Sequence, residues 1–268
     1  MPDQDAAAQF PLVDGFHGIR MGVDLSGLRP GSVRVVESPR RLQREKGYGY
    51  IRALWWLWLE DGRSAVSVPP GAGRAVQQIA ENIRGIGRNI RAPERILDPA
   101  LAEQLTQPVN TALRAAGLGE VDRVLPDLCF ACDASLLRGH SLGDCRRLTD
   151  ESIPPAEGLG LPTHCFPDGV AYGVAADGKV VSVASSHRTG VMEDLVADTG
   201  VETARAYRRR GCAKTAVSAL VGHFTQAGGE ARYGCSPGNL ASIATARSVG
   251  FVPYGTSLVL SAPESDPI

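Results

Sequence analysis

The residues with the clearest chemical potential lie between 203 and 214, where a predicted strand ends and a predicted helix begins. Arg205 and the run Arg208 to Arg210 precede Gly211, and the small Ala213 follows in the first helical turn. The first N–H groups of a helix have no partner within it, and the helix dipole places positive charge there. A pyrophosphate could therefore approach the backbone at this turn. A helix start with solvated arginines would look similar, so this segment alone leaves both interpretations open.

A second segment, residues 235–251, repeats the succession of strand, turn and helix. Cys235 ends a predicted strand, Asn239 opens the helix that follows, and Gly250-Phe251 come after that helix. Ser242, three residues after Asn239, can lie beside the same turn. Asn239 is also a favourable N-cap residue and Ser242 could lie on the helix surface, so a purely structural role stays open for both.

Together, and in this order, the two segments resemble the GNAT superfamily of acyl-coenzyme-A-dependent N-acyltransferases, over about residues 140–262. The first superfamily pattern, Gln/Arg-x-x-Gly-x-Gly/Ala, is matched by Arg208-Arg209-Arg210-Gly211-Cys212-Ala213. The second is matched by Asn239, Ser242 and Gly250-Phe251. Within the superfamily the chain looks most like the zwittermicin-resistance-type acetyltransferases, on the runs Gly200-Val201-Glu202-Thr203-Ala204, Tyr207-Arg208 and Asn239-x-x-Ser242-Ile243.

The resemblance implies acetyl-CoA as co-substrate and a GNAT fold, which is an α+β domain with a mostly antiparallel mixed sheet flanked by helices. It implies that the pantetheine arm pairs with the backbone near Val201 and Thr203, and that Asn239 and Ser242 line this arm. The pyrophosphate would be held by the turn and helix start, which comprise Arg208, Arg209, Arg210, Gly211, Cys212, Ala213 and Lys214.

The catalytic groups are harder to assign. An amine acceptor is protonated at neutral pH, so a base has to take a proton before or during attack on the thioester. Relatives use a carboxylate on the central strand, and the spacing from Arg208 favours Asp198 first and Glu193 second. A solvated strand residue is the commoner role for a carboxylate at either position. A backbone N–H near Val201 would stabilise the oxyanion.

The leaving-group acid of many relatives is absent. They place a tyrosine four residues before the glycine of Gly250-Phe251, where this chain has Ala246. Tyr254 is the nearest phenol, either as a weak acid or as packing at a sheet edge. A thiol with a pKa of about 8.5 is an adequate leaving group as the thiolate, so acyl transfer can proceed without a leaving-group acid. We expect direct transfer in a ternary complex, without a covalent nucleophile.

A zinc site is the alternative chemistry that the sequence offers. Its candidate ligands would be Cys129, Cys132, Cys145, Cys165, His140 and His164. Cys129 and Cys132 lie three apart in an apolar strand-like run, so their side chains point to opposite faces. A second close Cys or His pair is also missing. We therefore predict no metal.

The elements that position these residues predict two domains, residues 1–125 and 126–268. The smaller N-terminal α/β domain is expected to serve the acceptor side or a structural role. Its predicted parts are an irregular arm at 1–32, strands at 33–36, 53–59 and 64–68, a helix carrying Val76 and Ile79, and a helix capped by Asp98 that Pro108 kinks or splits. The second domain has a strand near 127–132 and then the order βββαβαβ: strands at 169–175, 179–185, 193–203, 231–235 and 258–260, and helices at 211–227 and 239–249. The short loop between Thr149 and Gly169 leaves little room for the two helices that usually follow the first GNAT strand.

The amino-acid composition and net charge limit which classes of partner can be expected. The 268 residues carry a net charge of -1 and are 43% hydrophobic, so no overall field attracts nucleic acid or an anionic membrane. The longest apolar run, 53–59, is too short to span a bilayer, and no signal segment is apparent, which predicts a cytoplasmic protein with reduced thiols. We expect a small antibiotic-like or amino-acid-like amine as acceptor, with a homodimer left open. The alternatives are a carrier-protein, protein or tRNA-linked acceptor, or a non-catalytic acyl-CoA-binding module.

Overall fold

The computed structural model describes residues 9–85, 98–149, 154–161 and 169–263, and the chain divides into two compact units. The first unit contains Met1–Cys129 and Tyr254–Ile268, and the second contains Phe130–Pro253. The predicted division, 1–125 and 126–268, differs from this because the last strand belongs to the first unit. Among the helices of the described residues, none is long and apolar enough to cross a membrane.

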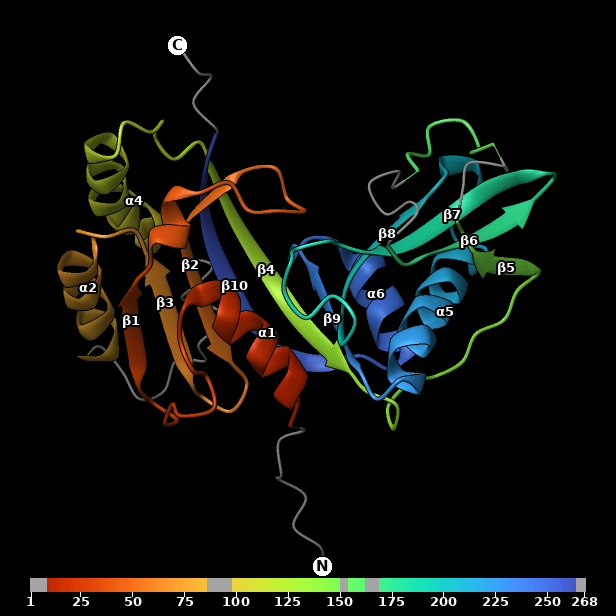
Figure 1. Ribbon diagram of the computed structural model, residues 1–268, viewed down its shortest axis with the longest axis horizontal. Helices are drawn as coiled ribbons and strands as arrows, with labels where there is room; N and C mark the ends of the chain where they lie inside the picture. Colours follow the sequence, from red (N-terminus) through yellow and green to blue (C-terminus); the bar gives the residue numbers. More distant parts are fainter. Residues whose placement is uncertain (1–8, 86–97, 150–153, 162–168, 264–268) are drawn as a thin grey trace, which may run out of the picture. The chain divides into compact units, whose positions relative to one another are not determined.

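The first unit is built on a sheet with strand order β1-β3-β2-β10-β4. Its elements are α1 (Pro11–Met21), β1 (Val33–Glu37), the 3-10 helix η1 (Pro39–Leu42), β2 (Ile51–Leu59), β3 (Ser64–Val68), α2 (Gly73–Gly85), α4 (Pro99–Ala115), the start of β4 (Arg123–Cys132) and most of β10 (Val252–Ala262). β1 pairs with β3 in parallel, whereas β2 is antiparallel to both β3 and β10 (Figure 1). The predicted hairpin of the tryptophan-rich strand and its successor is confirmed.

Helices cover both faces of β2, because its successive side chains point in opposite directions. Leu54 and Trp56 pack into the core formed with α2 and α4. Trp55 points the other way and meets His17 of α1, with ring centroids 5.3 Å apart. α4 runs unbroken through Pro108, so the predicted split does not occur. The Asp98 side chain caps α4 by accepting a hydrogen bond from Ala100, as predicted.

The predicted irregular arm at 1–32 is wrong for residues 11–21, which form α1. Glycines inside a helix lower its propensity, and they obscure the apolar spacing in the sequence. Burial of Val13, Phe16 and Met21 against the sheet stabilises the helix instead. Gly18 is required because a Cβ there would lie 2.6 Å from the carbonyl oxygen of Val23, where the chain folds back.

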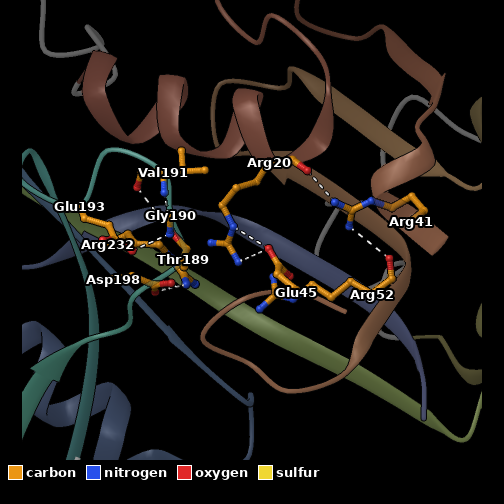
Figure 2. Close-up of polar contacts among 10 residues, drawn as sticks. All are labelled: Arg20, Arg41, Glu45, Arg52, Thr189, Gly190, Val191, Glu193, Asp198 and Arg232. Carbon is orange, nitrogen blue, oxygen red and sulfur yellow. Dashed lines mark hydrogen bonds and ion pairs between the residues drawn. The ribbon is translucent and has the colours of Figure 1, made fainter. Parts of the chain in front are cut away.

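The first unit contains a buried ionic cluster, formed by Arg20 of α1 with Arg41, Glu45 and Arg52 (Figure 2). The Glu45 carboxylate accepts from Arg20 at 2.7 Å and pairs with Arg52 at 2.6 Å. Arg41 donates to the backbone carbonyls of Arg20 and Arg52. Burial alone would raise the pKa of Glu45, but the guanidinium groups of Arg52, Arg20 and Arg41 together outweigh it and lower this pKa. Burial lowers the pKa of Arg41 to about 10.

The second unit has the strand order β4-β9-β8-β7-β6-β5. Its elements are β5 (Asp144–Arg147), β6 (Ala171–Ala176), β7 (Lys179–Ser186), β8 (Val196–Thr203), the 3-10 helix η3 (Arg205–Tyr207), α5 (Cys212–Gln226), β9 (Glu230–Cys235) and α6 (Leu240–Val249). The strands from β5 to β8 are antiparallel and β8 pairs with β9 in parallel, which confirms the predicted mixed, mostly antiparallel sheet. β5 is an additional strand that the sequence did not predict.

The two helices of the second unit pack against each other and against the sheet (Figure 1). The hydroxyls of Tyr233 on β9 and Ser242 on α6 are 2.6 Å apart, so α6 lies over the face to which Tyr233 points. Thr199 of β8 is the register partner of Tyr233 and therefore shares this face. It follows that Asp198, Gly200 and Glu202 point to the opposite face.

Candidate active site

The edge of β8 opens toward β9 beyond Thr199. The parallel ladder with β9 runs from Val196 to Thr199, whereas pairing with β7 continues to Thr203. The Ala204 N–H donates to the carbonyl of Val181 in β7, and the Asp198 carbonyl accepts from the N–H of His187, the residue that follows β7. Bonded residues alternate in an antiparallel pair, so Val201 and Thr203 direct their backbone groups away from β7, toward the open edge.

A cavity of about 690 Å³ follows this edge and reaches the starts of α5 and α6. Of the residues predicted to bind the coenzyme, all but Arg210 line it: Val201, Thr203, Arg208, Arg209, Gly211, Cys212, Ala213, Lys214, Asn239 and Ser242. Arg210 lies over the ring of Tyr207 instead, 5.1 Å from its centroid. Arg208 donates to the carbonyl of Thr203 at 3.2 Å. Two segments that are far apart in the sequence thus border one cavity.

The backbone at the start of α5 forms a concave set of donors. Arg209 and Gly211 adopt left-handed conformations, with φ of 61° and 87°. Alternation of left-handed with other conformations in successive residues creates an anion-binding concavity of N–H groups. The first bond within α5 runs from Thr215 N–H to Gly211, so the N–H groups of Cys212, Ala213 and Lys214 precede it. This arrangement suits a phosphate group.

At the start of α6, both predicted residues also have structural partners. The Asn239 side chain accepts from the Ser242 N–H at 3.1 Å, which makes Asn239 the N-cap. Burial raises the pKa of Tyr233, whose hydroxyl is hydrogen-bonded to Ser242. Gly250 ends α6 with φ of 110°, and a Cβ there would overlap the carbonyl oxygen of Leu136. The motif glycine therefore lets the chain pass closely under the helix end.

The two predicted carboxylate bases lie outside the residues that line this cavity. Asp198 is 1% exposed and accepts a hydrogen bond from Arg232 at 2.5 Å (Figure 2). Glu193 accepts from the Gly190 N–H at 2.5 Å and lies 3.6 Å from Arg188 in the loop before β8. Their catalytic roles stay predictions.

Tyr254 belongs to the first unit, where its hydroxyl donates to Asp14 at 2.6 Å. Its ring stacks on His17 with centroids 5.5 Å apart. Burial, followed by the charge of Asp14, raises the pKa of Tyr254 well above its usual value. Ala246, at the position of the tyrosine found in relatives, is fully buried in α6.

A second cavity, of about 440 Å³, involves the same end of β8. It is lined by Gly160, Leu161, Val183, Ser185, His187, Gly200, Val201 and Glu202. Val201 and Glu202 border both cavities. His187 was not among the residues predicted from the sequence, because no local motif surrounds it. Its signal is the alternation Val183, Ser185, His187 along a strand that pairs with β8.

In the described parts of the chain, no group of three or more His, Cys, Asp or Glu side chains could hold a metal ion. His164 and Cys165, which the zinc alternative needs, lie outside the described residues. Burial raises the pKa of the Cys132 thiol to about 12.

Comparisons with known proteins match one part of the chain to a family. Residues 144–251 match the model of the acetyltransferase (GNAT) family. The chain is similar to a GNAT-family protein from Novosphingobium aromaticivorans, with 20% identity, a TM-score of 0.44, and 55% of this chain and 68% of that one covered. A GCN5-related N-acetyltransferase from Kribbella flavida has 17% identity, a TM-score of 0.41 and coverage of 63% and 77%. A tandem GNAT protein from the clavulanic acid biosynthesis pathway has 16% identity, a TM-score of 0.43 and coverage of 74% and 71%. A search of curated protein sequences finds no match.

Proposed function

We propose that the protein moves an acetyl group from acetyl-CoA to a primary amine of a small molecule, because residues 144–251 match the model of the acetyltransferase (GNAT) family. The observation that carries this proposal is the 690 Å³ cavity that both motif segments border at the open edge of β8. Its volume is in the range of small-molecule and cofactor sites, about 300–1,000 Å³.

In this proposal the pyrophosphate of acetyl-CoA lies at the start of α5. The left-handed Arg209 and Gly211 and the N–H groups of the first helical turn supply donors, and Arg208 and Lys214 supply positive charge. The pantetheine arm lies along β8, where the backbone groups of Val201 and Thr203 face the cavity side. Asn239 and Ser242 border this arm from α6.

The acetyl group is transferred directly from the thioester to the amine, without a covalent enzyme intermediate. The Val201 N–H is the proposed donor to the carbonyl oxygen as negative charge develops on it. Cys212 and Cys235 are buried, at 6% and 7% exposure, and packing explains both. The departing thiolate needs little acid assistance, consistent with Ala246 at the position where relatives carry a tyrosine.

On the motif stretches around Gly200 and Asn239 we also place the domain with the zwittermicin-resistance-type group, and propose an antibiotic-like or amino-acid-like acceptor. The first unit is proposed to contribute to acceptor binding. A second candidate acceptor is a phosphate-rich molecule such as a charged tRNA, because Arg205, Arg208, Arg209 and Arg210 are all exposed. A salt-dependent mobility shift with tRNA tests that candidate. The phosphates of the coenzyme account for the same arginines.

Calorimetry with acetyl-CoA tests the coenzyme site. Gly211→Glu should abolish binding, because it puts a side chain and a negative charge at the proposed phosphate cradle. The matched control is Gly228→Glu, which follows the other end of α5, also has a positive φ, of 80°, and has open space around its Cβ position. Unchanged affinity in Gly211→Glu, or equal losses in both variants, would overturn the assignment.

A further inference from the structure

We propose that His187 is the proton acceptor for the amine, and that the 440 Å³ cavity beside it holds the acceptor as a cationic primary amine. This inference rests on the proposed acetyltransferase function and extends it to the acceptor side. Three features support it: His187 follows β7 opposite Asp198 of β8, its imidazole lies against Gly200, and charged side chains surround it.

The side chains of this cavity come from facing positions of two paired strands. The β7–β8 register sets Ser185 opposite Gly200 and Val183 opposite Glu202, and continues to His187 opposite Asp198. Facing side chains of an antiparallel pair lie on the same face of the sheet, with Cβ atoms about 5 Å apart. This is the face opposite Thr199 and Tyr233, and α6 covers the Tyr233 side. The 440 Å³ cavity lies on this face, so an amine that enters it approaches β8 from the side opposite α6.

Gly200 lets the imidazole lie against the strand at this point. A Cβ at Gly200 would be 2.9 Å from Nε2 of His187, so any larger residue would displace the ring. The next residue, Val201, borders both cavities. Consecutive Cα atoms are about 3.8 Å apart, so the imidazole is within one residue of the proposed oxyanion donor. A base needs such proximity to reach the nitrogen that attacks the carbonyl.

The charges around His187 favour it over the neighbouring carboxylates as the base. Glu202 borders the same cavity and is exposed, so its carboxylate can attract an ammonium group. Asp198, opposite His187, is buried in an ion pair with Arg232. Protonating Asp198 would disrupt this buried pair, which is costly. An imidazole is a proton acceptor of suitable strength at neutral pH.

Neutral His187 takes one proton from the ammonium group, and the free amine attacks the thioester carbonyl to form a C–N bond. The tetrahedral intermediate loses a second proton from nitrogen to solvent, and the C–S bond breaks. The thiolate takes up a proton from solvent and protonated His187 releases its proton to solvent, which regenerates the base. The products are the acetamide, coenzyme A with its thiol, and one proton.

The test compares His187→Gln with His223→Gln. His223 lies on α5 in the same unit, hydrogen-bonded to the Tyr172 hydroxyl at 3.4 Å, outside both cavities. Wild type and variants are assayed with acetyl-CoA and four amines, which are lysine, spermidine, glucosamine and phenethylamine, and the fastest acceptor is kept. His187→Gln should lower kcat by about 10²-fold or more with unchanged affinity for acetyl-CoA, whereas His223→Gln should retain wild-type kcat.

The pH profile separates proton transfer from a structural role. Wild-type kcat/KM should rise with pH as the imidazole loses its proton, and in His187→Gln this rise should move toward the pKa of the amine. Glu202→Gln should raise KM by about tenfold and change kcat less. His187→Asn provides the same comparison if the glutamine variant does not fold.

The outcomes distinguish the inference from the function on which it rests. Wild-type protein that binds no acetyl-CoA overturns the proposed function. Wild-type protein that binds acetyl-CoA but acetylates none of the four amines overturns the cationic-amine cavity. A His187→Gln variant with kcat within threefold of wild type and an unchanged pH profile overturns the role of His187.

Discussion

Removing Arg232 should destabilise the second unit strongly, because it breaks a buried ion pair. The Arg232 guanidinium is 2.5 Å from the Asp198 carboxylate, and the two side chains are 8% and 2% exposed. Two unit charges about 4 Å apart attract by about 4 kcal/mol at an effective dielectric constant of 20. Leaving one charge buried after its partner is removed typically costs about 3–5 kcal/mol. We expect a loss in this range for Arg232→Met.

The double variant Asp198→Leu/Arg232→Met supplies the decisive comparison. Replacing both charges with apolar groups of similar volume removes the desolvation cost together with the attraction, so its stability should lie within about 2 kcal/mol of wild type. A structural role for Asp198 predicts that this variant also retains measurable kcat, whereas a catalytic base at Asp198 predicts that it stays inactive.

The assay has to report on the second unit. All three tryptophans, Trp55, Trp56 and Trp58, lie in β2 of the first unit, so their fluorescence follows that unit. Urea unfolding should instead be followed by circular dichroism and by hydrogen exchange of β8 and β9 peptides. A loss below about 1 kcal/mol in Arg232→Met, or a double variant as unstable as the single one, would refute the reasoning.

Three further predictions concern other parts of the fold. The folded state lowers the pKa of Glu45, so the ionised carboxylate should stabilise the protein above its unfolded pKa, near 4.5, and this stabilisation should be lost as the pH falls through the folded pKa. Denaturant midpoints measured between pH 7 and 3 should show this loss. The loss should be smaller in Glu45→Gln. Gly250→Ala should lower the free energy of unfolding by about 3 kcal/mol or more, because its Cβ would overlap a backbone carbonyl oxygen. Gly228→Ala, at a residue with a positive φ but open space, should lower it by about 1 kcal/mol. Equal melting temperatures for the two variants would contradict this. Tyr254→Phe should lower the free energy of unfolding by about 1.5–3 kcal/mol, because the hydrogen bond to Asp14 is lost. It should lower kcat less than tenfold. A thousandfold drop in kcat with intact folding would show that Tyr254 is a catalytic acid.

Much of the second unit could be predicted from sequence because its signals are local. The starts of α5 and α6 are marked by Gly211 and by the capping residue Asn239, and the structure has both helices within a residue or two of their predicted bounds. The turn between β6 and β7 was marked by Asp177-Gly178, which both adopt positive φ. Local chemistry determines each of these features, so a short stretch of sequence contains enough information.

The features that could not be predicted depend on contacts distant in the chain. α1 is stabilised by packing on β2, which no spacing within 11–21 indicates. β10 was predicted as three residues because its extent is set by pairing with β2. His187 has no motif, and only the register of β7 against β8 brings it to Gly200. A single sequence shows which residues alternate along a strand but not which strand pairs with it, and this pairing determines where the side chains lie.

The position of β10 has a consequence for biosynthesis. This strand lies between β2 and β4 in the sheet of the first unit, yet the ribosome makes it only after all of Phe130–Pro253. At about 5–20 residues per second, the nascent chain waits on the order of ten seconds with the β2 edge unpaired. That edge belongs to the most apolar strand of the protein, and an open apolar edge is a template for aggregation. The first unit to be synthesised is therefore the last to be completed, and it should depend on chaperones that hold nascent chains more than the second unit does.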